Sequence, residues 1–411
     1  MGQGIAPWRA VAAFALAAAF FCYGFVHRVA PSVMVAELMR DLGVGAAVLG
    51  NLAALYFWAY AGLQIPVGVL LDRLGPRRLV SGALATIALG SVVFAYGGSL
   101  IGLSIGRLLI GVGAAFSWVG CLTVATQMFE PRRFPLLTGI AQTVGVAGAV
   151  LGQVPLALAI GTVGWQHANA ALGVVGLLLA LAFWLIVRDR AHAVESGQGL
   201  LVGLRQVARN PQTWVCALFS MSLTAPIQAF AGLWGVPYLQ VAYGIDKAAA
   251  SQVTTFMFYG WMAGAVSAGF VINWIGRRRP VAALGSFFAT ATLAAALFWP
   301  GRLPIFGVET LMALHGLSAG VMLTGFIVAR EQNPASASGA AYGLVNTCVV
   351  GIGGVMQLVI GMLLDLRWAG TVSAGIRVYD VPAYLFAFVT LTALGAAGFL
   401  AALRLKEPRG P

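Results

Sequence analysis

The chain has 411 residues, of which 60% are hydrophobic and only 9% are charged. A soluble globular protein carries about 25% charged residues because its surface is hydrated, so this composition excludes a soluble protein. The formal net charge of +12 would suggest nucleic-acid binding in a soluble chain. In a membrane protein, Lys and Arg concentrated in cytoplasmic loops explain such a charge, and we expect no nucleic-acid partner.

Apolar segments long enough to cross a bilayer follow one another along the whole chain. A spanning helix needs about 20 apolar residues, so a chain of this length has room for about a dozen such helices. We therefore predict an all-α membrane protein with twelve transmembrane helices. The predicted helices are 8–35, 46–71, 79–97, 100–128, 135–160, 166–187, 212–240, 248–274, 281–299, 304–329, 337–364 and 382–403.

A polar stretch divides the predicted helices into two groups of six. This stretch, 188–211, is the only long charged connection and is too short to form a domain. We predict an N-terminal six-helix half over residues 1–187, a cytoplasmic central loop over residues 188–211 and a C-terminal six-helix half over residues 212–411.

The distribution of Lys and Arg predicts the orientation. If the N-terminus is cytoplasmic, the inner loops and tails hold 17 of these residues and the outer loops hold 5. Cytoplasmic loops of membrane proteins carry such an excess, so we expect both termini in the cytoplasm. The expected location is the lipid bilayer of a bacterial inner membrane, crossed several times by the chain.

The first helix contains the stretch FCYGFVHRVAPSVM, which includes Tyr23, His27 and Arg28. Tyr23 and His27 are four residues apart and share a helix face. The guanidinium group of Arg28 could bind a carboxylate through two parallel hydrogen bonds. Alternatively, the long side chain could extend along the helix to the membrane surface. Both interpretations stay open.

A charged loop motif occurs twice. The stretch GVLLDRLGPRR follows the second predicted helix, and GFVINWIGRRR follows the eighth, with equivalent positions 201 residues apart. The glycines permit close helix approach and a turn. The motif residues are Gly68, Asp72, Arg73, Gly75, Arg77 and Arg78 in the first copy and Gly269, Asn273 and Gly276 in the second.

Further polar residues lie within apolar helices. Arg107 in the fourth helix either faces a cavity or braces the packing of neighbouring helices. The remaining residues could line a hydrated cavity or form hydrogen bonds between helices. With Tyr23, His27 and Arg28 they make up the candidate substrate site: Tyr56, Tyr60, Gln142, Gln228, Tyr259, His315 and Asn346.

Acidic residues are almost absent from the predicted helices. Apart from Asp72, no Asp or Glu falls in the middle of a span, which disfavours a cationic solute. Whether a proton is a coupling partner stays open. If it is, His27 and His315 are the candidate carriers, since histidine titrates near neutral pH. The sequence shows no metal-ligand spacing, and we expect neither a metal nor a cofactor.

The loop GVLLDRLGPRR resembles the signature loop between helices 2 and 3 of the major facilitator superfamily, G-x-x-x-D-R-x-G-R/P-R-R. The resemblance implies two pseudo-symmetric six-helix halves and transport by alternating access. It also implies a conformational role for the motif residues. The stretch around Arg107, GRLLIGVGAAF, is similar to a family pattern whose arginine is linked to proton coupling. The position of Arg28 resembles that of a substrate-binding arginine in organic-anion members.

We therefore expect a monomeric secondary transporter of a small anionic or zwitterionic organic solute. One alternative is an exporter of a siderophore, metabolite or drug by proton antiport, which the glycines Gly139, Gly148 and Gly152 favour. Another alternative, from a different class, is a non-transporting membrane receptor. No catalytic arrangement of residues is present, so an enzyme is not expected. The solute and the direction of transport stay open.

Overall fold

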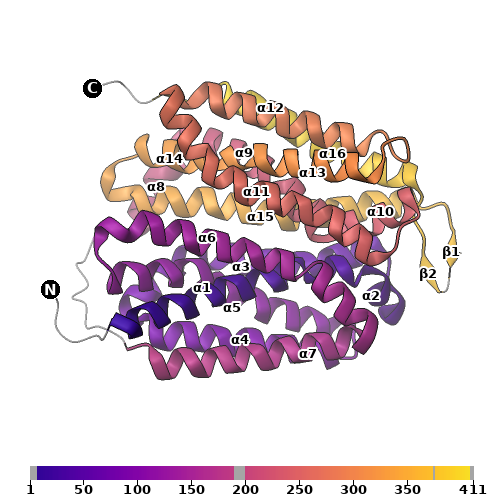
Figure 1. The fold of residues 1–411 in the computed structure, drawn as a ribbon, viewed down its shortest axis with the longest axis horizontal. Coiled ribbons are helices and arrows are strands. Elements are labelled where there is room, and N and C mark those ends of the chain that lie inside the picture. The colour runs from indigo at the N-terminus through magenta and orange to yellow at the C-terminus, as the bar shows by residue number, and fades with distance from the viewer. Residues whose placement is uncertain (1–6, 189–199, 374, 408–411) are drawn as a thin grey trace. The chain divides into compact units, whose positions relative to one another are not determined.

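The computed structural model describes residues 7–188, 200–373 and 375–407, which are almost entirely helical (Figure 1). In these residues, 11 helical segments are long and apolar enough to cross a membrane. One of them, Leu136–Ile186, has 51 residues and is broken at Gly164, where φ is 80°. At 1.5 Å per residue it exceeds twice the thickness of the bilayer core, about 30 Å, and so provides two crossings. The described residues therefore agree with twelve transmembrane helices.

The helices of the first part of the chain lie close to the predicted ranges. The predicted helix at 100–128 coincides with α5, and most other ends differ by a few residues. The elements are α1 (Pro7–Val29), η1 (Ala30–Val33), α2 (Val35–Leu42), α3 (Ala46–Leu74), α4 (Pro76–Tyr96), α5 (Leu100–Met128), η2 (Pro131–Arg133), α6 (Phe134–Leu151) and α7 (Val154–Ile186).

The second part adds elements that hydropathy does not reveal. The predicted helix at 212–240 is three elements, with a π-helix, η3, in its middle. The elements are α8 (Leu200–Ala208), α9 (Pro211–Pro226), η3 (Ile227–Trp234), α10 (Gly235–Tyr243), α11 (Lys247–Ile275), α12 (Arg278–Leu297), α13 (Ile305–Ala319), η4 (Gly320–Met322), α14 (Leu323–Glu331), η5 (Ala335–Ala337), α15 (Ser338–Leu366), β1 (Val372–Ser373), β2 (Ile376–Arg377) and α16 (Val381–Ala402).

A short helix and a two-stranded hairpin lie between spanning helices. Helix α2 has 8 residues and buries Val35, Leu38 and Met39, so it is amphipathic and far too short to span. Strands β1 and β2 form an antiparallel hairpin in which Val372 pairs with Arg377. Neither element has the long apolar run by which the spanning helices were predicted.

Packing divides the chain into two compact units. The first is Met1–Arg28 with Trp58–Glu195, and the second is Val29–Phe57 with Ser196–Pro411. The segment Val29–Phe57 belongs to the predicted N-terminal half but packs with helices of the C-terminal half. In the first unit α4 lies between α5 and α7; in the second, α13 packs on α11 and α12 (Figure 1).

Glycine allows the closest of these helix contacts. A Cβ atom on Gly113 of α5 would lie 2.4 Å from the carbonyl oxygen of Ala83 in α4. In the second unit, a Cβ atom on Gly316 of α13 would lie 2.0 Å from the carbonyl oxygen of Met257 in α11. Small residues let transmembrane helix backbones touch, which explains much of the high glycine content.

Candidate functional site

Arg28 is the last residue of its segment in the first unit and is 9% exposed. Its guanidinium carbon lies 4.4 Å from the ring centroid of Phe25 and 5.0 Å from that of Tyr60. Tyr60 stands midway along α3. The cationic group is therefore held by two aromatic rings at mid-length of a spanning helix, a favourable contact for a desolvated cation. Extension of the side chain to a helix end does not fit this position.

Tyr23, His27 and Arg107 connect helices of the first unit. The hydroxyl of Tyr23 donates to the carbonyl oxygen of Leu172 at 2.8 Å, and Nε2 of His27 lies 3.3 Å from Oγ of Ser91. Nη1 of Arg107 donates to the carbonyl oxygen of His27 at 2.9 Å. These contacts tie α1 to α4, α5 and α7 through buried polar groups. The three side chains thus stabilise helix packing, which for Arg107 is one of the two alternatives that the sequence leaves open.

The first unit combines buried cations with a scarcity of acidic residues in its spanning helices. The sequences of α1, α4, α5, α6 and α7 contain no Asp or Glu, while Arg28 and Arg107 are buried. Buried charge of one sign attracts ions of the other sign. The interior of this unit is therefore suited to an anion and unsuited to a cation.

Neutral hydrogen-bonding groups lie on α3 and α6 in the same unit. Gln64 is one turn after Tyr60 on α3, is buried, and donates from Nε2 to the carbonyl oxygen of Ala115 at 3.4 Å. Tyr60 is also buried, and Gln142 on α6 is half-buried. Tyr60 and Gln142 both belong to the substrate site predicted from the sequence, whereas Gln64 adds a third polar group to the same unit.

Two buried glutamines mark the second unit. Gln228 lies in the π-helix η3 and donates from Nε2 to the carbonyl oxygen of Val349 at 2.6 Å, and Gln357 on α15 donates from Nε2 to the carbonyl oxygen of Gln228 at 2.8 Å. Within the described residues, both Oε1 atoms are buried and accept no hydrogen bond. An unsatisfied buried acceptor is costly, so each is ready to accept from a ligand. π-Helices occur frequently at functional sites.

The other predicted residues of the second unit have different surroundings. Tyr56 is fully buried beside Phe57, and Asn346 on α15 is half-buried. Tyr259 on α11 is 48% exposed. His315 is buried, and its Nδ1 lies 2.8 Å from the carbonyl oxygen of Ala289 in α12, so this ring contributes to a helix contact.

The glycines of the loop motif stand at the ends of α3 and α11. Gly75 has φ 78° between α3 and α4, and Gly276 has φ 69° after α11, which are conformations that favour glycine. A Cβ atom on Gly68 or Gly269 would meet no other atom within 4 Å, so neither glycine is required for a close helix contact.

Among the charged residues of the motif, Arg77 contacts another helix. Nε of Arg77 donates to the carbonyl oxygen of Trp184 at 2.8 Å, and its guanidinium lies over that indole ring. Arg73 and Arg78 are exposed. The side chains of Asp72 and Asn273 lie outside the described part of the chain, so their predicted conformational role stays a prediction.

Comparison with known proteins decides the family. Residues 16–358 match the family model of the Major Facilitator Superfamily. The chain belongs to the Major Facilitator Superfamily. The match confirms the family and the fold class that the loop motif and the hydropathy pattern predict. The relatives of the chain are transporters, not enzymes.

Two relatives of this superfamily member carry the names of organic-acid transporters. The chain is 24% identical over 267 residues to a probable L-galactonate transporter of Escherichia coli, an alignment that covers 61% of this chain and 59% of that protein. It is 26% identical over 261 residues to a probable sulfoacetate transporter, SauU, of Cupriavidus necator, covering 59% of each protein. The matched region thus spans about three fifths of the length of these relatives.

A solved structure shares the whole fold. A bacterial homologue of the human lysosomal transporter Spinster, in an inward-facing and unoccupied conformation, superposes with a TM-score of 0.79. The match covers 98% of both chains at 17% sequence identity. This similarity confirms the major facilitator fold.

Gln357 and Asp365 of this superfamily member were not among the residues predicted from the sequence. Gln357 could have been found, because it is a polar residue in an apolar helix. Asp365 contacts the start of α3, 319 residues earlier in the chain. A contact over such a separation leaves no pattern in a single sequence.

Proposed function

We propose that this protein is a secondary transporter that moves a small organic anion across the bacterial inner membrane by alternating access. The observation that carries this proposal is the buried guanidinium of Arg28, stacked on Phe25 and Tyr60 in a unit whose spanning helices are almost free of acidic residues. The names of the two relatives, which refer to L-galactonate and sulfoacetate, support an organic acid as the solute class.

Arg28 is the proposed ligand of the carboxylate. Its planar guanidinium matches the two oxygens of a carboxylate, and the rings stacked on it limit the rotation that binding would otherwise restrict. Tyr60 and Gln142 supply hydrogen-bonding groups from the same unit. His27 and Tyr23 support Arg28 from α1 by holding that helix against its neighbours.

The second unit supplies acceptors in this proposal. Oε1 of Gln228, which accepts no hydrogen bond from the described residues, is a proposed acceptor for a hydroxyl group, and Gln357 holds the η3 backbone beside it. Hydroxyl recognition by a buried acceptor discriminates strongly, because an analogue without the hydroxyl leaves the acceptor unpaired. Tyr56, Tyr259 and Asn346 are the remaining proposed contacts from this unit. His315 is a packing residue whose Nε2 has no hydrogen-bond partner in the part of the chain that the structure describes.

We also propose the arrangement of the protein in the membrane. Both termini and the central loop face the cytoplasm, so α2, the β1–β2 hairpin and the start of α3 lie on the outer side. The six-helix halves 1–187 and 212–411 are the moving bodies, and the loop Gly68–Arg78 with its repeat copy is a conformational element. The excess of Lys and Arg on one side supports this orientation.

Counterflow in proteoliposomes tests the proposed function. Hydroxylated monocarboxylates and dicarboxylates are offered to the wild type, Arg28→Lys and Arg28→Ala, with Arg40→Lys as control because Arg40 lies on the surface beside Asp41. We expect saturable counterflow of an acid, a loss of about tenfold or more in Arg28→Lys, and background in Arg28→Ala. Full activity of Arg28→Ala would remove Arg28 from the site. Counterflow of cationic drugs alone would favour an exporter instead.

A further inference from the structure

The start of α3 has no capping residue of its own. The first backbone N–H groups of a helix lack partners within it, and Ser, Thr, Asp or Asn before the helix usually accepts from them. Ser99 does so for α5, and Asp380 does so for α16, accepting from the Ala383 amide at 2.9 Å. In front of α3 stands Gly45, which has no side chain.

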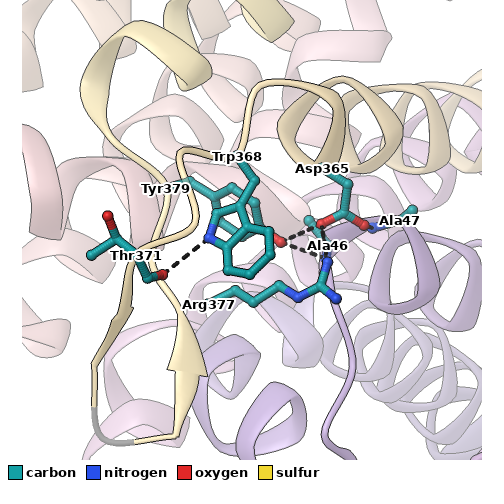
Figure 2. Close-up of polar contacts among 7 residues, drawn as sticks. All are labelled: Ala46, Ala47, Asp365, Trp368, Thr371, Arg377 and Tyr379. Carbon is teal, nitrogen blue, oxygen red and sulfur yellow. Dashed lines mark hydrogen bonds and ion pairs between the residues drawn. The ribbon is translucent and has the colours of Figure 1, made fainter.

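A carboxylate from the far end of α15 takes this place. Oδ1 of Asp365 accepts from the backbone N–H of Ala46 at 3.2 Å, and Oδ2 accepts from that of Ala47 at 2.9 Å (Figure 2). Both oxygens therefore cap the positive end of the α3 dipole, where a negative charge is stabilised. The contact joins the first sequence repeat to the second, within one compact unit.

Two residues after the β1–β2 turn hold the carboxylate in position. The hydroxyl of Tyr379 donates to Oδ1 of Asp365 at 2.5 Å, and Nη1 of Arg377 lies 3.4 Å from the same oxygen. Arg377 also lies over the ring of Trp368, whose Nε1 donates to Thr371 (Figure 2). Burial, and then the hydrogen bond to Asp365, raise the pKa of Tyr379, so its hydroxyl stays protonated and donates.

The backbones of α3 and α15 touch beside this cluster. A Cβ atom on Gly45 would lie 2.7 Å from Oδ1 of Asp365, and one on Gly50 would lie 2.5 Å from the carbonyl oxygen of Gln357. On the α15 side, a Cβ atom on Gly361 would lie 2.4 Å from the carbonyl oxygen of Ala46. A second contact between the repeats, the ion pair of Glu37 with Lys247, lies between α2 and α11.

We infer that Asp365, Arg377 and Tyr379 form a latch that holds the outer start of α3 to α15 and that must open once in every transport cycle. The inference rests on the proposed alternating access and orientation. Outward opening separates the two repeats, and the latch spans them. The side chain of Asp365 is 22% exposed, so water can replace its partners when they separate, which makes the contact reversible.

Spin-label distances test the latch without any need for the solute. In a variant without the four native cysteines, labels are placed at Arg40 and Arg302, two exposed positions. We expect Asp365→Asn and Gly45→Ala to increase the fraction of molecules with a long distance between the two labels by about fivefold. The reason is that each substitution removes or displaces the carboxylate that caps α3. The matched controls are Asp380→Asn, a carboxylate that caps its own helix, and Gly62→Ala, where a Cβ atom meets nothing. Unchanged distances in both latch variants would overturn the inference.

A reducible cross-link tests the need to open. Cysteines replace Glu37 and Lys247, and a short reducible thiol cross-linker joins them. We expect counterflow to fall by about tenfold or more and to recover on reduction. A protein whose latch stays closed cannot open to the outer side and therefore cannot complete the transport cycle. Undiminished counterflow in fully cross-linked protein would overturn the latch. Absence of counterflow before cross-linking would instead count against the proposed transport, and the distance measurement would still decide the latch.

Discussion

The starts of α3 and α11 are equivalent positions of the two sequence repeats, yet they are capped in opposite ways. Gly45 and Asp246 are 201 residues apart, the spacing of the repeated loop motif. Asp246 accepts from the backbone N–H of Ala249 at 2.8 Å and so caps its own helix. Helix α3 is instead capped by Asp365, which belongs to α15. A cap from the residue before a helix does not depend on other helices, whereas a cap from another helix depends on the position of that helix.

The helix that corresponds to α15 in the first repeat sharpens this difference. It begins at Phe134, as α15 begins at Ser338, and from there to the break at Gly164 it contains no Asp or Glu. The capping carboxylate therefore exists in one repeat only. The comparison teaches that a pseudo-symmetric fold can place its conformational contact on one side while the other side keeps a self-sufficient helix.

The largest expected effect separates the two caps directly. Asp365→Ala should lower the free energy of unfolding by about 2–3 kcal/mol, because it leaves the Ala47 N–H and the Tyr379 hydroxyl without their acceptor and removes one of the two acceptors of the Ala46 N–H. Asp246→Ala should cost only about 1 kcal/mol, the usual value of a local cap. Unfolding by dodecyl sulfate, followed by circular dichroism, measures both. Equal losses would contradict the distinction.

The close approach of α3 and α15 provides the next test. Gly50→Ala should destabilise by about 1–3 kcal/mol, since its Cβ would lie 2.5 Å from a backbone oxygen of Gln357. Gly62→Ala in the same helix meets no atoms and should be neutral or slightly stabilising. The same unfolding titration compares them, and a neutral Gly50→Ala would show that the two backbones can move apart without cost.

A smaller effect is expected from the hydroxyl that orients the carboxylate. Tyr379→Phe keeps the ring but removes the donor to Asp365 and one of the two acceptors of the Ala46 N–H, which should cost about 1 kcal/mol. Tyr384→Phe is the control, because its ring packs on Phe388 nearby. If Tyr379→Phe leaves both the unfolding free energy and the spin-label distances unchanged, the hydroxyl has no part in the latch.

The smallest effect concerns Arg377. Its side chain is 41% exposed and its contact with Asp365 measures 3.4 Å, so Arg377→Gln should change stability by less than about 0.5 kcal/mol. We expect this small effect to disappear in high salt, which screens exposed charges. Unfolding titrations at two ionic strengths measure it, and a loss as large as that of Asp365→Ala would mean that the arginine, and not the cap, holds the helices together.

Hydropathy and a repeated loop motif were sufficient to predict most of the fold. Helix α5 coincides with its predicted range, and the two crossings within Leu136–Ile186 were predicted as separate helices. The π-helix η3 and the amphipathic α2 were missed, because a backbone register shift and a short half-buried helix do not alter the long apolar runs. In the candidate site, Arg28 could be selected by its charge alone, but its stacking on Tyr60 could not be foreseen.

The sequence by itself determined that this chain spans a membrane in two related groups of helices and carries arginines where acids are rare. These properties depend on composition and on the local order of residues, because these set the free energy of transferring each segment into the bilayer. Only the tertiary structure decided that Tyr23 and His27 brace helices, that Gln228 and Gln357 present unpaired acceptors, and that Asp365 caps α3. Such roles depend on contacts between residues that are far apart in the sequence, and helix packing determines those contacts.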